Sequence, residues 1–360
     1  MSNISVVIPS FNHAPFIQQA VESVLQQTET NLELIVVDDG STDESMNILS
    51  TFSDPRMHVI QQENQGAHSA INLGLSKSTG KFLAILNSDD TFHPERLEKA
   101  ITVLEADENI GLVGSFINII NENSNSIGEK RGYQNCEPWI LEKPERSFRA
   151  GNDLRAALLT ENYWSTTSNF VFPRLWYQRV GEFYPLRYTH DWDFALRMAS
   201  KANLYLIQEP LINYRVHSRN TIREDQATMI FEICWILAIN LPSHIIDSEF
   251  FGKLTLETRT ERLLHSIYVF GCERVLSVML LQEIHTNPKQ ALLLLDIANP
   301  VREKYLEFIC ETVIKNQRFD SQIDTHNGSS GRTIHNFLRL GYIPEVKSWL
   351  HQLLDKKTTG

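Results

Sequence analysis

The chain contains few cysteines and no long apolar segment. Its four cysteines form no C-x-x-C pair, so they predict free thiols in a reducing compartment rather than a disulfide framework. No apolar run approaches the ~20 residues needed to span a bilayer. The N-terminus shows neither a basic segment nor a small-residue cleavage site. We therefore expect a soluble cytoplasmic protein, with peripheral contact to the inner face of the membrane left open. The cysteines are Cys136, Cys234, Cys272 and Cys310.

The sequence also lacks an excess of basic residues. It carries 33 Lys and Arg against 44 Asp and Glu, a formal net charge of −11. Residues 1–224 hold 19 of the basic and 28 of the acidic residues, so most of the imbalance lies there. A nucleic-acid-binding domain needs a basic face, and this balance argues against nucleic acid as a partner. Acidic clusters in the first part instead suit the recruitment of a metal ion.

Strand-like and helix-like segments alternate in the first part of the chain. Continuous apolar runs predict buried strands at residues 4–9, 32–37, 57–60 and 82–86. Apolar residues at helical spacing predict helices at 14–27, up to Ser50, at 67–75 and at 94–106. Pro9 has no N–H and is expected to end the first strand's ladder. The alternation predicts an α/β fold with a mostly parallel sheet flanked by helices.

The pattern changes after a strand-like run at residues 110–120. Residues 121–132 are polar and rich in turn formers, which predicts a hairpin tip or a mobile loop. From about residue 225 the apolar spacing becomes helical throughout. We expect two regions, an α/β domain of residues 1–224 and an all-helical C-terminal region of residues 225–360. The expected helices of the second region are 228–239, 254–278, 287–297, 301–315, 333–340 and 344–354.

Acidic and polar residues follow the predicted strands. Asp38 and Asp39 come after the second strand, and the segment N-S-D-D, Asn87–Asp90, comes after the fourth. Ligands of open α/β sheets bind beyond the carboxyl ends of the strands. Helix N-caps use the same residue types, so one of these acids is open to a capping role. Two adjacent carboxylates after a buried strand favour a cation such as Mn²⁺ or Mg²⁺ with a phosphorylated ligand.

Other segments indicate a site only in combination. Phe11 offers a flat face near a strand end, and Gly66 allows close approach of a phosphate to a helix N-terminus. The segment H-D-W-D (190–193) opens an apolar-periodic helix, and Y-R-V-H (214–217) supplies an arginine and a histidine. Each also has a structural explanation, namely core packing for Phe11, helix-dipole acids for residues 190–193, and ordinary packed residues for the last segment.

Taken together, these segments resemble the family 2 glycosyltransferases, which have a Rossmann-like GT-A fold. The resemblance covers residues 3–224. It implies a hexosyltransferase that takes a nucleotide sugar, with UDP as the expected nucleotide, and that uses Mn²⁺ or Mg²⁺ and inverts the anomeric configuration. The absence of the Q-x-x-R-W motif implies non-processive transfer, in surface-glycan synthesis or glycoconjugate assembly. The motifs are V-V-I-P-S-F-N (6–12), V-V-D-D-G-S-T-D (36–43), E-N-Q-G (63–66), A-I-N-L-G (70–74), N-S-D-D (87–90), H-D-W-D (190–193) and Y-R-V-H-x-x-N (214–220).

The resemblance also implies roles for individual residues. Asp191 is expected to be the catalytic base, with His190 in place of the usual acidic residue before it. Asp90 and His217 are expected to bind the metal, Asp39 the nucleobase and Asp89 the sugar nucleotide. Further nucleotide-sugar contacts are expected from Pro9, Phe11, Asn12, Asn64, Gly66, Asn72, Ser88 and Arg215. Trp164, Trp192 and His190 are acceptor-side candidates, although core packing explains the two tryptophans equally well.

Other classes of protein remain compatible with the same residues. A nucleotidyltransferase or phosphohydrolase would use these aspartates but release pyrophosphate or phosphate, whereas a glycosyltransferase releases UDP. An inactive sugar-nucleotide-binding scaffold would keep the fold without turnover. No G-x-G-x-x-G follows the first strand, which argues against a dehydrogenase. The acceptor is left open between a glycan, a lipid-linked sugar and a protein, as is oligomerisation through the C-terminal helices.

Overall fold

The computed structural model describes residues 3–131, 134–135, 158, 162–217, 225–247 and 290–310. The chain divides into two compact units, residues 1–144 with 161–221 and residues 145–160 with 222–360. This division passes close to the predicted boundary at residue 224, while the domain assignment itself stays a prediction. The predicted helices at 254–278, 333–340 and 344–354 lie outside the described residues.

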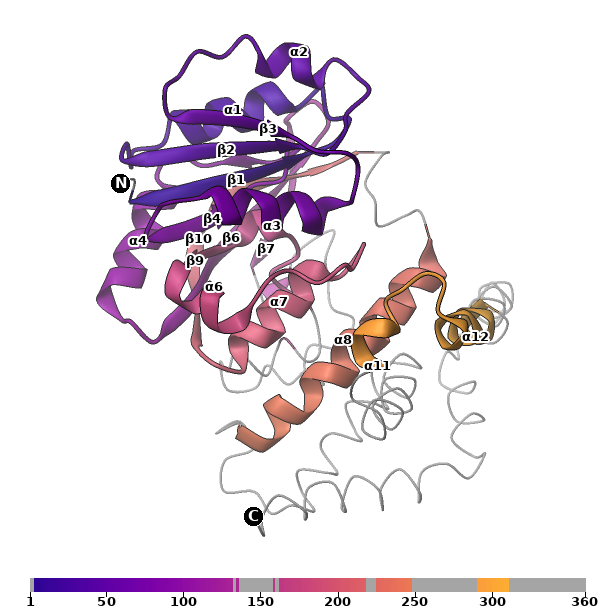
Figure 1. The fold of residues 1–360 in the computed structure, drawn as a ribbon. Coiled ribbons are helices and arrows are strands. Elements are labelled where there is room, and N and C mark those ends of the chain that lie inside the picture. The colour runs from indigo at the N-terminus through magenta and orange to yellow at the C-terminus, as the bar shows by residue number, and fades with distance from the viewer. Residues whose placement is uncertain are drawn as a thin grey trace, which may run out of the picture. The chain divides into compact units, whose positions relative to one another are not determined.

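A single mixed sheet forms the centre of the first unit (Figure 1). Along its main path the strand order is β3-β2-β1-β4-β9-β6-β10-β5, with β7 paired to β6 and β8 paired to β7. The strands are β1 (Ile4–Ser10), β2 (Leu32–Asp38), β3 (Met57–Gln61), β4 (Phe82–Ile85), β5 (Thr91–Phe92), β6 (Ile110–Asn121), β7 (Ser126–Arg131), β8 (Gln134–Asn135), β9 (Val171–Pro173) and β10 (Asn203–Val216).

Most paired residues of the sheet lie in parallel ladders. β1 is parallel to β2 and β4, β2 is parallel to β3, and β10 is parallel to β6. β9 is antiparallel to β4 and β6, so a reversed strand joins the two parallel parts. The carboxyl ends of β1, β2 and β4 therefore meet at one edge. The predicted mostly parallel sheet flanked by helices is confirmed.

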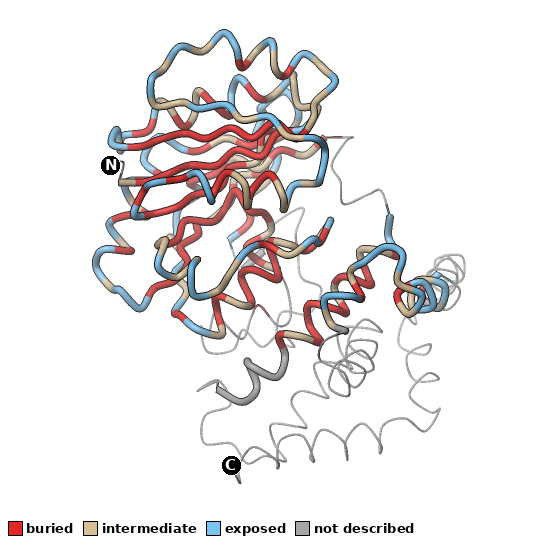
Figure 2. The backbone as a smooth tube through the Cα atoms, in the orientation of Figure 1, coloured by how far each residue is buried: buried red, intermediate tan, exposed pale blue. Residues whose placement is uncertain are grey.

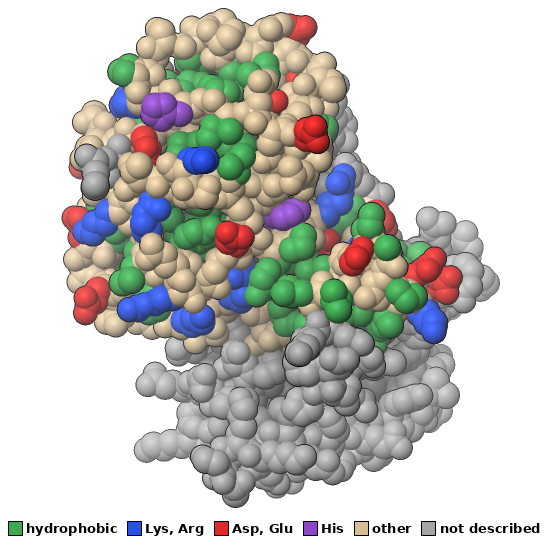
Figure 3. Space-filling model, in the orientation of Figure 1, with side chains coloured by type: hydrophobic (Ala, Val, Ile, Leu, Met, Phe, Trp, Pro, Cys, Tyr) green, Lys and Arg blue, Asp and Glu red, His purple; other side chains and the backbone are tan. Residues whose placement is uncertain are grey.

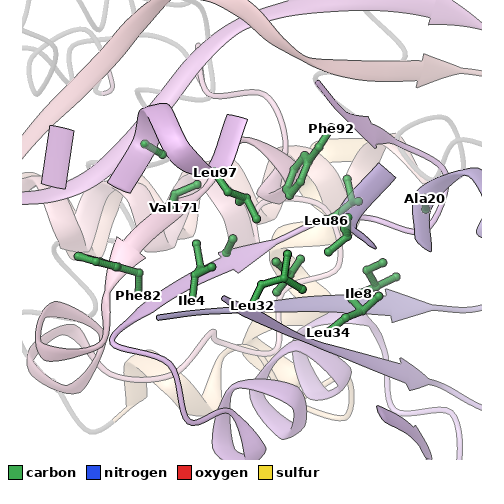
Figure 4. Close-up of a cluster of buried hydrophobic side chains, with 14 of the residues drawn as sticks. Ile4, Ile8, Ala20, Leu32, Leu34, Phe82, Leu86, Phe92, Leu97 and Val171 are labelled. Atoms are coloured by element: carbon green, nitrogen blue, oxygen red, sulfur yellow. The ribbon is translucent and has the colours of Figure 1, made fainter. Parts of the chain in front are cut away.

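Helices cover both faces of this sheet (Figure 1). On one face, side chains of α1, α2 and α4 join alternate strand residues such as Ile4, Ile8 and Leu34 in one apolar cluster (Figure 4). On the other face, α3 packs so closely that a Cβ on Gly74 would lie 2.4 Å from Val7 Cγ1. The helices are α1 (Ile17–Leu25), α2 (Ser45–Leu49), α3 (Ala67–Lys77), α4 (Arg96–Ala106), α6 (Arg174–Val180) and α7 (His190–Ala199).

Burial on both faces explains the continuous apolar runs of the central strands. Every residue of β1 and β2 is buried, and Figure 2 shows the central strands as the most buried part of the unit. α7 is anchored by stacked aromatic rings. The ring centroids of Phe183, in the loop before α7, and Phe194, in α7, lie 4.2 Å apart. Phe194 also lies 5.2 Å from Phe172 of β9, measured between ring centroids. This packing fixes α7, whose first turn carries Asp191.

The backbone hydrogen bonds test two local predictions, one on the end of β1 and one on the segment after residue 120. The expectation that Pro9 ends the ladder is wrong, because β1 pairs with β2 through Ser10, and the Ser10 carbonyl accepts a hydrogen bond from Asp39 N at 2.8 Å. Proline removes only a donor, so its neighbours keep their acceptors. The segment after residue 120 forms a hairpin, because β7 returns antiparallel to β6.

The second unit contributes three helices within the described residues. They are α8 (Gln226–Asp247), α11 (Gln290–Leu293) and α12 (Pro300–Phe308), which fall within or overlap three of the predicted helices. Trp235 Nε1 of α8 donates a hydrogen bond to the Ala291 carbonyl of α11 at 2.7 Å. Among the described residues, none of the helices has the length and apolar character of a membrane span.

Candidate active site

The loops after β1 and β2 are held together by side-chain bridges. Asn12 adopts a positive φ of 54°, which its short polar side chain tolerates better than most. Its Oδ1 accepts a hydrogen bond from Thr42 N at 2.8 Å, and its own N–H donates to Ser41 Oγ at 2.9 Å. Asp43 Oδ2 in turn accepts from Ala14 N at 2.9 Å. These bonds fix the backbone on either side of His13.

Asp39 organises the loop that leads into α3. Its Oδ1 accepts hydrogen bonds from Gln62 Nε2 at 2.6 Å and Gln65 N at 2.8 Å, and its Oδ2 accepts from Gly66 N at 2.8 Å. Gly66 has a φ of 89°, a conformation that favours glycine at the start of α3. Asn64 stands exposed on the same loop. The predicted residues Asp39, Asn64 and Gly66 therefore share one rim of the sheet.

Two histidines and one aspartate form a cluster beyond the end of β4. Asp89 Oδ2 lies 3.1 Å from His217 Nε2, and the rings of His13 and His217 meet edge to face with centroids 5.8 Å apart. One ligand atom from each of these three residues lies within 4.8 Å of the others. His13 Nδ1 also lies 2.7 Å from Ser88 Oγ. The loops after β1 and β4 and the end of β10 thus converge.

Asp90 occupies a different environment from Asp89. Its Oδ2 accepts a hydrogen bond from Ser168 Oγ at 2.5 Å and its Oδ1 accepts from Arg215 N at 2.8 Å. Burial, followed by the negative charge of Asp89, raises the pKa of Asp90 well above its usual range. For Asp89, burial opposes ionisation, but the hydrogen bond with His217 and the charges of both imidazoles outweigh it and lower the pKa.

The predicted metal pair was Asp90 with His217. The structure instead brings Asp89 and His217 together with His13, while both oxygens of Asp90 are engaged by the protein. The physical reason is the turn that follows β4, in which the Asp90 N–H bonds back to the Asn87 carbonyl. The roles of Asp90 and His217 as metal ligands stay predictions, and the structure adds Asp89 and His13 to the groups that lie close to His217.

Asp191 is joined to the N-S-D-D loop by one short segment, residues 162–169. Its Oδ2 accepts a hydrogen bond from Asn162 Nδ2 at 2.9 Å, at one end of that segment. At the other end, Ser168 binds Asp90 and accepts from Asn87 N at 2.9 Å. Asn87 also exchanges side-chain hydrogen bonds with Thr166 and Thr167, at 2.9 and 2.8 Å. The position of Asp191 is thus coupled to that of the acidic pair.

The pKa of Tyr214 is raised above its ordinary value. Burial is the first cause that raises the pKa of this phenol, and the negative charges of Asp90, Asp89 and Asp191 raise it further. Tyr214 directly precedes Arg215, whose backbone N–H donates to Asp90 Oδ1 at 2.8 Å at this end of β10.

Several other predicted residues have structural partners. Arg215 donates from Nε to the Asp89 carbonyl at 2.7 Å and from Nη1 to the Asn121 carbonyl at 3.2 Å, and its guanidinium stacks over Phe16 at 4.9 Å. Burial lowers its pKa. These contacts favour a role in holding the strand end. The predicted phosphate contact of Arg215 stays a prediction.

Asn72 and the two tryptophans also face the protein. The Asn72 amide donates to the Phe183 carbonyl and accepts from Phe183 N, both at 2.9 Å, which ties α3 to the loop before α7. Trp164 is fully buried and Trp192 is 7% exposed. This burial favours core packing for both rings. His190 is half-buried beside Phe183, and Phe11 exposes 43% of its surface near the rim.

Three contacts of the site were not predicted. They are those of His13 with Asp89 and His217, of Asn162 with Asp191, and of Ser168 with Asp90. His13 directly follows the motif V-V-I-P-S-F-N (6–12), so its place in the sequence could have indicated a site residue. Asn162 and Ser168 lie before an antiparallel strand that the alternation did not predict, so only the tertiary structure identifies their partners.

The cluster has the chemistry of a divalent-metal site. Neutral imidazoles and a carboxylate are the usual nitrogen and oxygen ligands of first-row divalent cations. The lowered pKa of Asp89 keeps that ligand ionised. Ser88 stands where an outer-shell partner would orient His13. These residues therefore fit a bound cation.

Comparison with known proteins identifies similar sequences. Residues 5–166 match the model of glycosyl transferase family 2. An uncharacterized glycosyltransferase of Rickettsia prowazekii is 29% identical over 220 residues, 61% of this chain and 65% of the relative. The glycosyltransferase GlyG of Streptococcus pneumoniae is 36% identical over 152 residues, 41% of this chain and 50% of GlyG. The chain thus covers just under two thirds of the first relative and half of the second.

The fold also has solved counterparts. The structure of residues 1–349 of S. aureus TarS superposes with a TM-score of 0.50 at 16% identity, covering 81% of this chain and 88% of that one. The same protein in complex with UDP gives a TM-score of 0.50 at 18% identity. Residues 5–166 of this chain are therefore similar to glycosyl transferase family 2, and the fold is of the GT-A type.

Proposed function

We propose that this protein is a metal-dependent, inverting glycosyltransferase of the hexosyl type. It takes a nucleotide sugar, with UDP as the nucleotide, and moves one sugar to an acceptor hydroxyl in the assembly of a surface glycan or other glycoconjugate. The observation that carries the proposal is the convergence at one rim of the sheet. There the His13, Asp89 and His217 cluster lies at the end of β4, and Asp191 is bonded to the segment that also holds Asp90.

The nucleotide end of the site is assigned to the loops after β1 and β2. The described contacts give Asp39 Oδ2 one hydrogen bond, and a carboxylate oxygen has room for a second, such as the imide N–H of uracil. Phe11 exposes a flat ring beside this rim. TarS, which has a similar fold, has been solved with UDP and with UDP-GlcNAc.

The diphosphate end is assigned to Asp89 and His217. A cation bound there supplies Lewis-acid chemistry, because it neutralises the negative charge that builds on the departing diphosphate. Asp89 contributes an ionised oxygen and His217 a ring nitrogen on the same side of the rim. Arg215 holds the Asp89 carbonyl and so fixes the backbone of this ligand.

Asp191 is assigned as the general base. An acceptor hydroxyl is a poor nucleophile, and a carboxylate within hydrogen-bond reach removes its proton as the new bond forms, an effect worth roughly 10²–10⁴-fold. Asn162 Nδ2 and Trp192 N hold the two oxygens at 2.9 and 2.7 Å, so the carboxylate is oriented. A single displacement with one base inverts the anomeric configuration. A product that keeps the donor configuration would contradict this mechanism.

The first test is a screen of nucleotide sugars with Mn²⁺ and no acceptor, measuring release of free nucleotide. We expect slow release of UDP from one UDP-sugar and no release of pyrophosphate. Pyrophosphate or inorganic phosphate as the product would instead identify a nucleotidyltransferase or a phosphohydrolase. UDP binding without any turnover, with acceptor mixtures present, would indicate an inactive scaffold.

The second test is the variant Asp191→Asn. We expect turnover to fall by about 10²–10⁴-fold, because the base is lost, while affinity for UDP stays near that of the unchanged protein. Calorimetry with UDP reports both the fold and the donor end of the site. The matched control is Asp107→Asn, which changes an acid at the end of α4. Wild-type turnover in Asp191→Asn would remove Asp191 from the mechanism.

A further inference from the structure

His13 was not among the expected site residues, and its backbone is unusually well fixed. The His13 carbonyl accepts hydrogen bonds from Phe16 N and Ile17 N, both at 2.9 Å, and so starts α1. On its other side, Asn12 is locked against the loop after β2 by its bond to Thr42 N. The backbone that carries the imidazole is therefore fixed on both sides before any ligand arrives, so binding would cost little backbone freedom.

The side chain of His13 is also oriented. A tautomer protonated on Nδ1 donates to Ser88 Oγ across 2.7 Å and leaves Nε2 with a free lone pair. Metal-binding histidines commonly use one ring nitrogen in this way while the other holds the metal. One ligand atom from each of His13, Asp89 and His217 lies within 4.8 Å of the others. The ring thus belongs to the same cluster as Asp89 and His217.

We propose that His13 is a third protein ligand of the cation, and that the site is a centre of two imidazoles and one carboxylate selective against Mg²⁺. This inference rests on the proposed function. Mg²⁺ is a hard cation that prefers oxygen ligands and dehydrates reluctantly. First-row transition ions accept imidazole readily, in the order Mn²⁺ below Co²⁺. The expected order of affinity is therefore Co²⁺, then Mn²⁺, then Mg²⁺.

The experiment titrates the metal-free full-length protein with Mn²⁺, with and without UDP, and follows free Mn²⁺ by electron paramagnetic resonance. Competition with Mg²⁺ and Co²⁺ gives the selectivity. Pulsed measurements on bound Mn²⁺ count the coupled imidazole nitrogens. We expect two imidazole couplings in the unchanged protein and one in His13→Ala. One coupling in both proteins, or equal affinity for Mg²⁺ and Mn²⁺, would overturn the proposal.

Matched variants separate ligation from folding. His13→Ala is expected to weaken Mn²⁺ binding by at least the about 10–100-fold typical of losing an outer-shell partner, and Ser88→Ala by about that amount. His58→Ala removes an exposed histidine of β3 and should leave Mn²⁺ binding unchanged. An unchanged Mn²⁺ affinity in a folded His13→Ala protein would also overturn the proposal. If UDP binds but the nitrogen count is one, this inference fails and the proposed function stands; if neither UDP nor Mn²⁺ binds, the proposed function itself fails.

Discussion

Besides the backbone N–H of Trp192, the amide side chain of Asn162 orients Asp191, and Asn162 belongs to the segment 162–169. Asn162 donates to Asp191 Oδ2 at 2.9 Å and accepts from Ser165 N at 3.2 Å. The carbonyl of Asn162 further accepts from the buried Lys130 Nζ at 3.1 Å. The proposed base is thus held by a chain of hydrogen bonds that begins at Lys130 in β7.

We expect Asn162→Ala to lower kcat by on the order of 10²-fold, because a carboxylate displaced by about 1 Å meets the acceptor proton poorly. The affinity for UDP should stay unchanged, since the hydrogen bonds described for the Asn162 side chain are with Asp191 and Ser165 and not with residues assigned to the donor. Steady-state kinetics and UDP calorimetry check both statements. The control is Asn109→Ala, an exposed amide in the turn before β6. A loss of UDP affinity equal to the loss of kcat would show that Asn162 holds the fold and not the base.

Strands β1, β2 and β4 are joined at their beginnings by a buried carboxylate. One oxygen of Glu33 in β2 accepts hydrogen bonds from Ser5 Oγ in β1, from Thr79 Oγ1 at 2.9 Å and from Gly80 N at 3.2 Å. Burial alone would raise the pKa of Glu33, but these hydrogen bonds outweigh it and lower the pKa below its ordinary value of 4.5. The group is therefore ionised in the folded protein down to lower pH than in the unfolded chain.

This lowered pKa makes the stability that Glu33 contributes to strands β1, β2 and β4 depend on pH. Because the unfolded chain takes up the proton first, the stability that Glu33 contributes is present above about pH 4.5 and is lost as pH falls through the lowered pKa. We expect Glu33→Gln to lower the free energy of unfolding by about 1–3 kcal/mol at pH 7. Urea denaturation from pH 3 to 7 should show the difference shrinking toward acid. A difference that is constant with pH would reject the charge as its cause.

The segment 162–169 packs on β6 through a glycine. A Cβ on Gly114 would lie 1.7 Å from Trp164 Cζ3, so the buried indole fills the space that a side chain would need. Gly114→Ala should therefore destabilise the protein by about 1–3 kcal/mol, the usual range for overpacking. It should also lower kcat, because the same segment holds Asp191 and Asp90.

Thermal unfolding and kinetics of Gly114→Ala test this coupling between packing and activity. The double variant Gly114→Ala with Trp164→Phe removes part of the ring that clashes and should recover part of the lost stability. If the single variant matches the unchanged protein in both measurements, the segment is not held by this contact.

The whole molecule separates into a unit that carries the site and a second, helical unit. Every residue of the cluster, together with Asp39 and Asp191, lies in the first unit. Lys, Arg, Asp and Glu side chains are interspersed among the described residues on the face drawn in Figure 3. Oligomerisation and the nature of the acceptor stay predictions.

We expect a chain ending at residue 224 to fold and to bind UDP with Mn²⁺, because the apolar cluster under β1, β2 and β4 lies wholly within those residues. Transfer to the natural acceptor is expected to fall if the helical unit contributes to that side. Circular dichroism and UDP calorimetry on the shortened chain check the first statement. An unfolded product would show that the second unit completes the core of the first.

Much of the fold was predictable because its signals are local. The spacing of apolar residues predicts buried strands and amphipathic helices. Strands β1 to β4 and the helices that follow them lie close to the predicted ranges. The antiparallel β9 was not predicted as part of the sheet. It is three residues long, and its place depends on pairing with β4 and β6, which are distant in sequence.

The amino-acid sequence by itself determined the resemblance to family 2 glycosyltransferases, the order of the main elements and the strand ends that carry the acidic residues. The tertiary structure decided which of two adjacent aspartates meets the histidines. That choice depends on the turn after β4, on the positive φ of Asn12, and on contacts between residues as far apart as His217 and Asp89. A sequence pattern fixes which residues follow a strand, whereas the direction of each side chain is set by hydrogen bonds between loops that only the folded chain brings together.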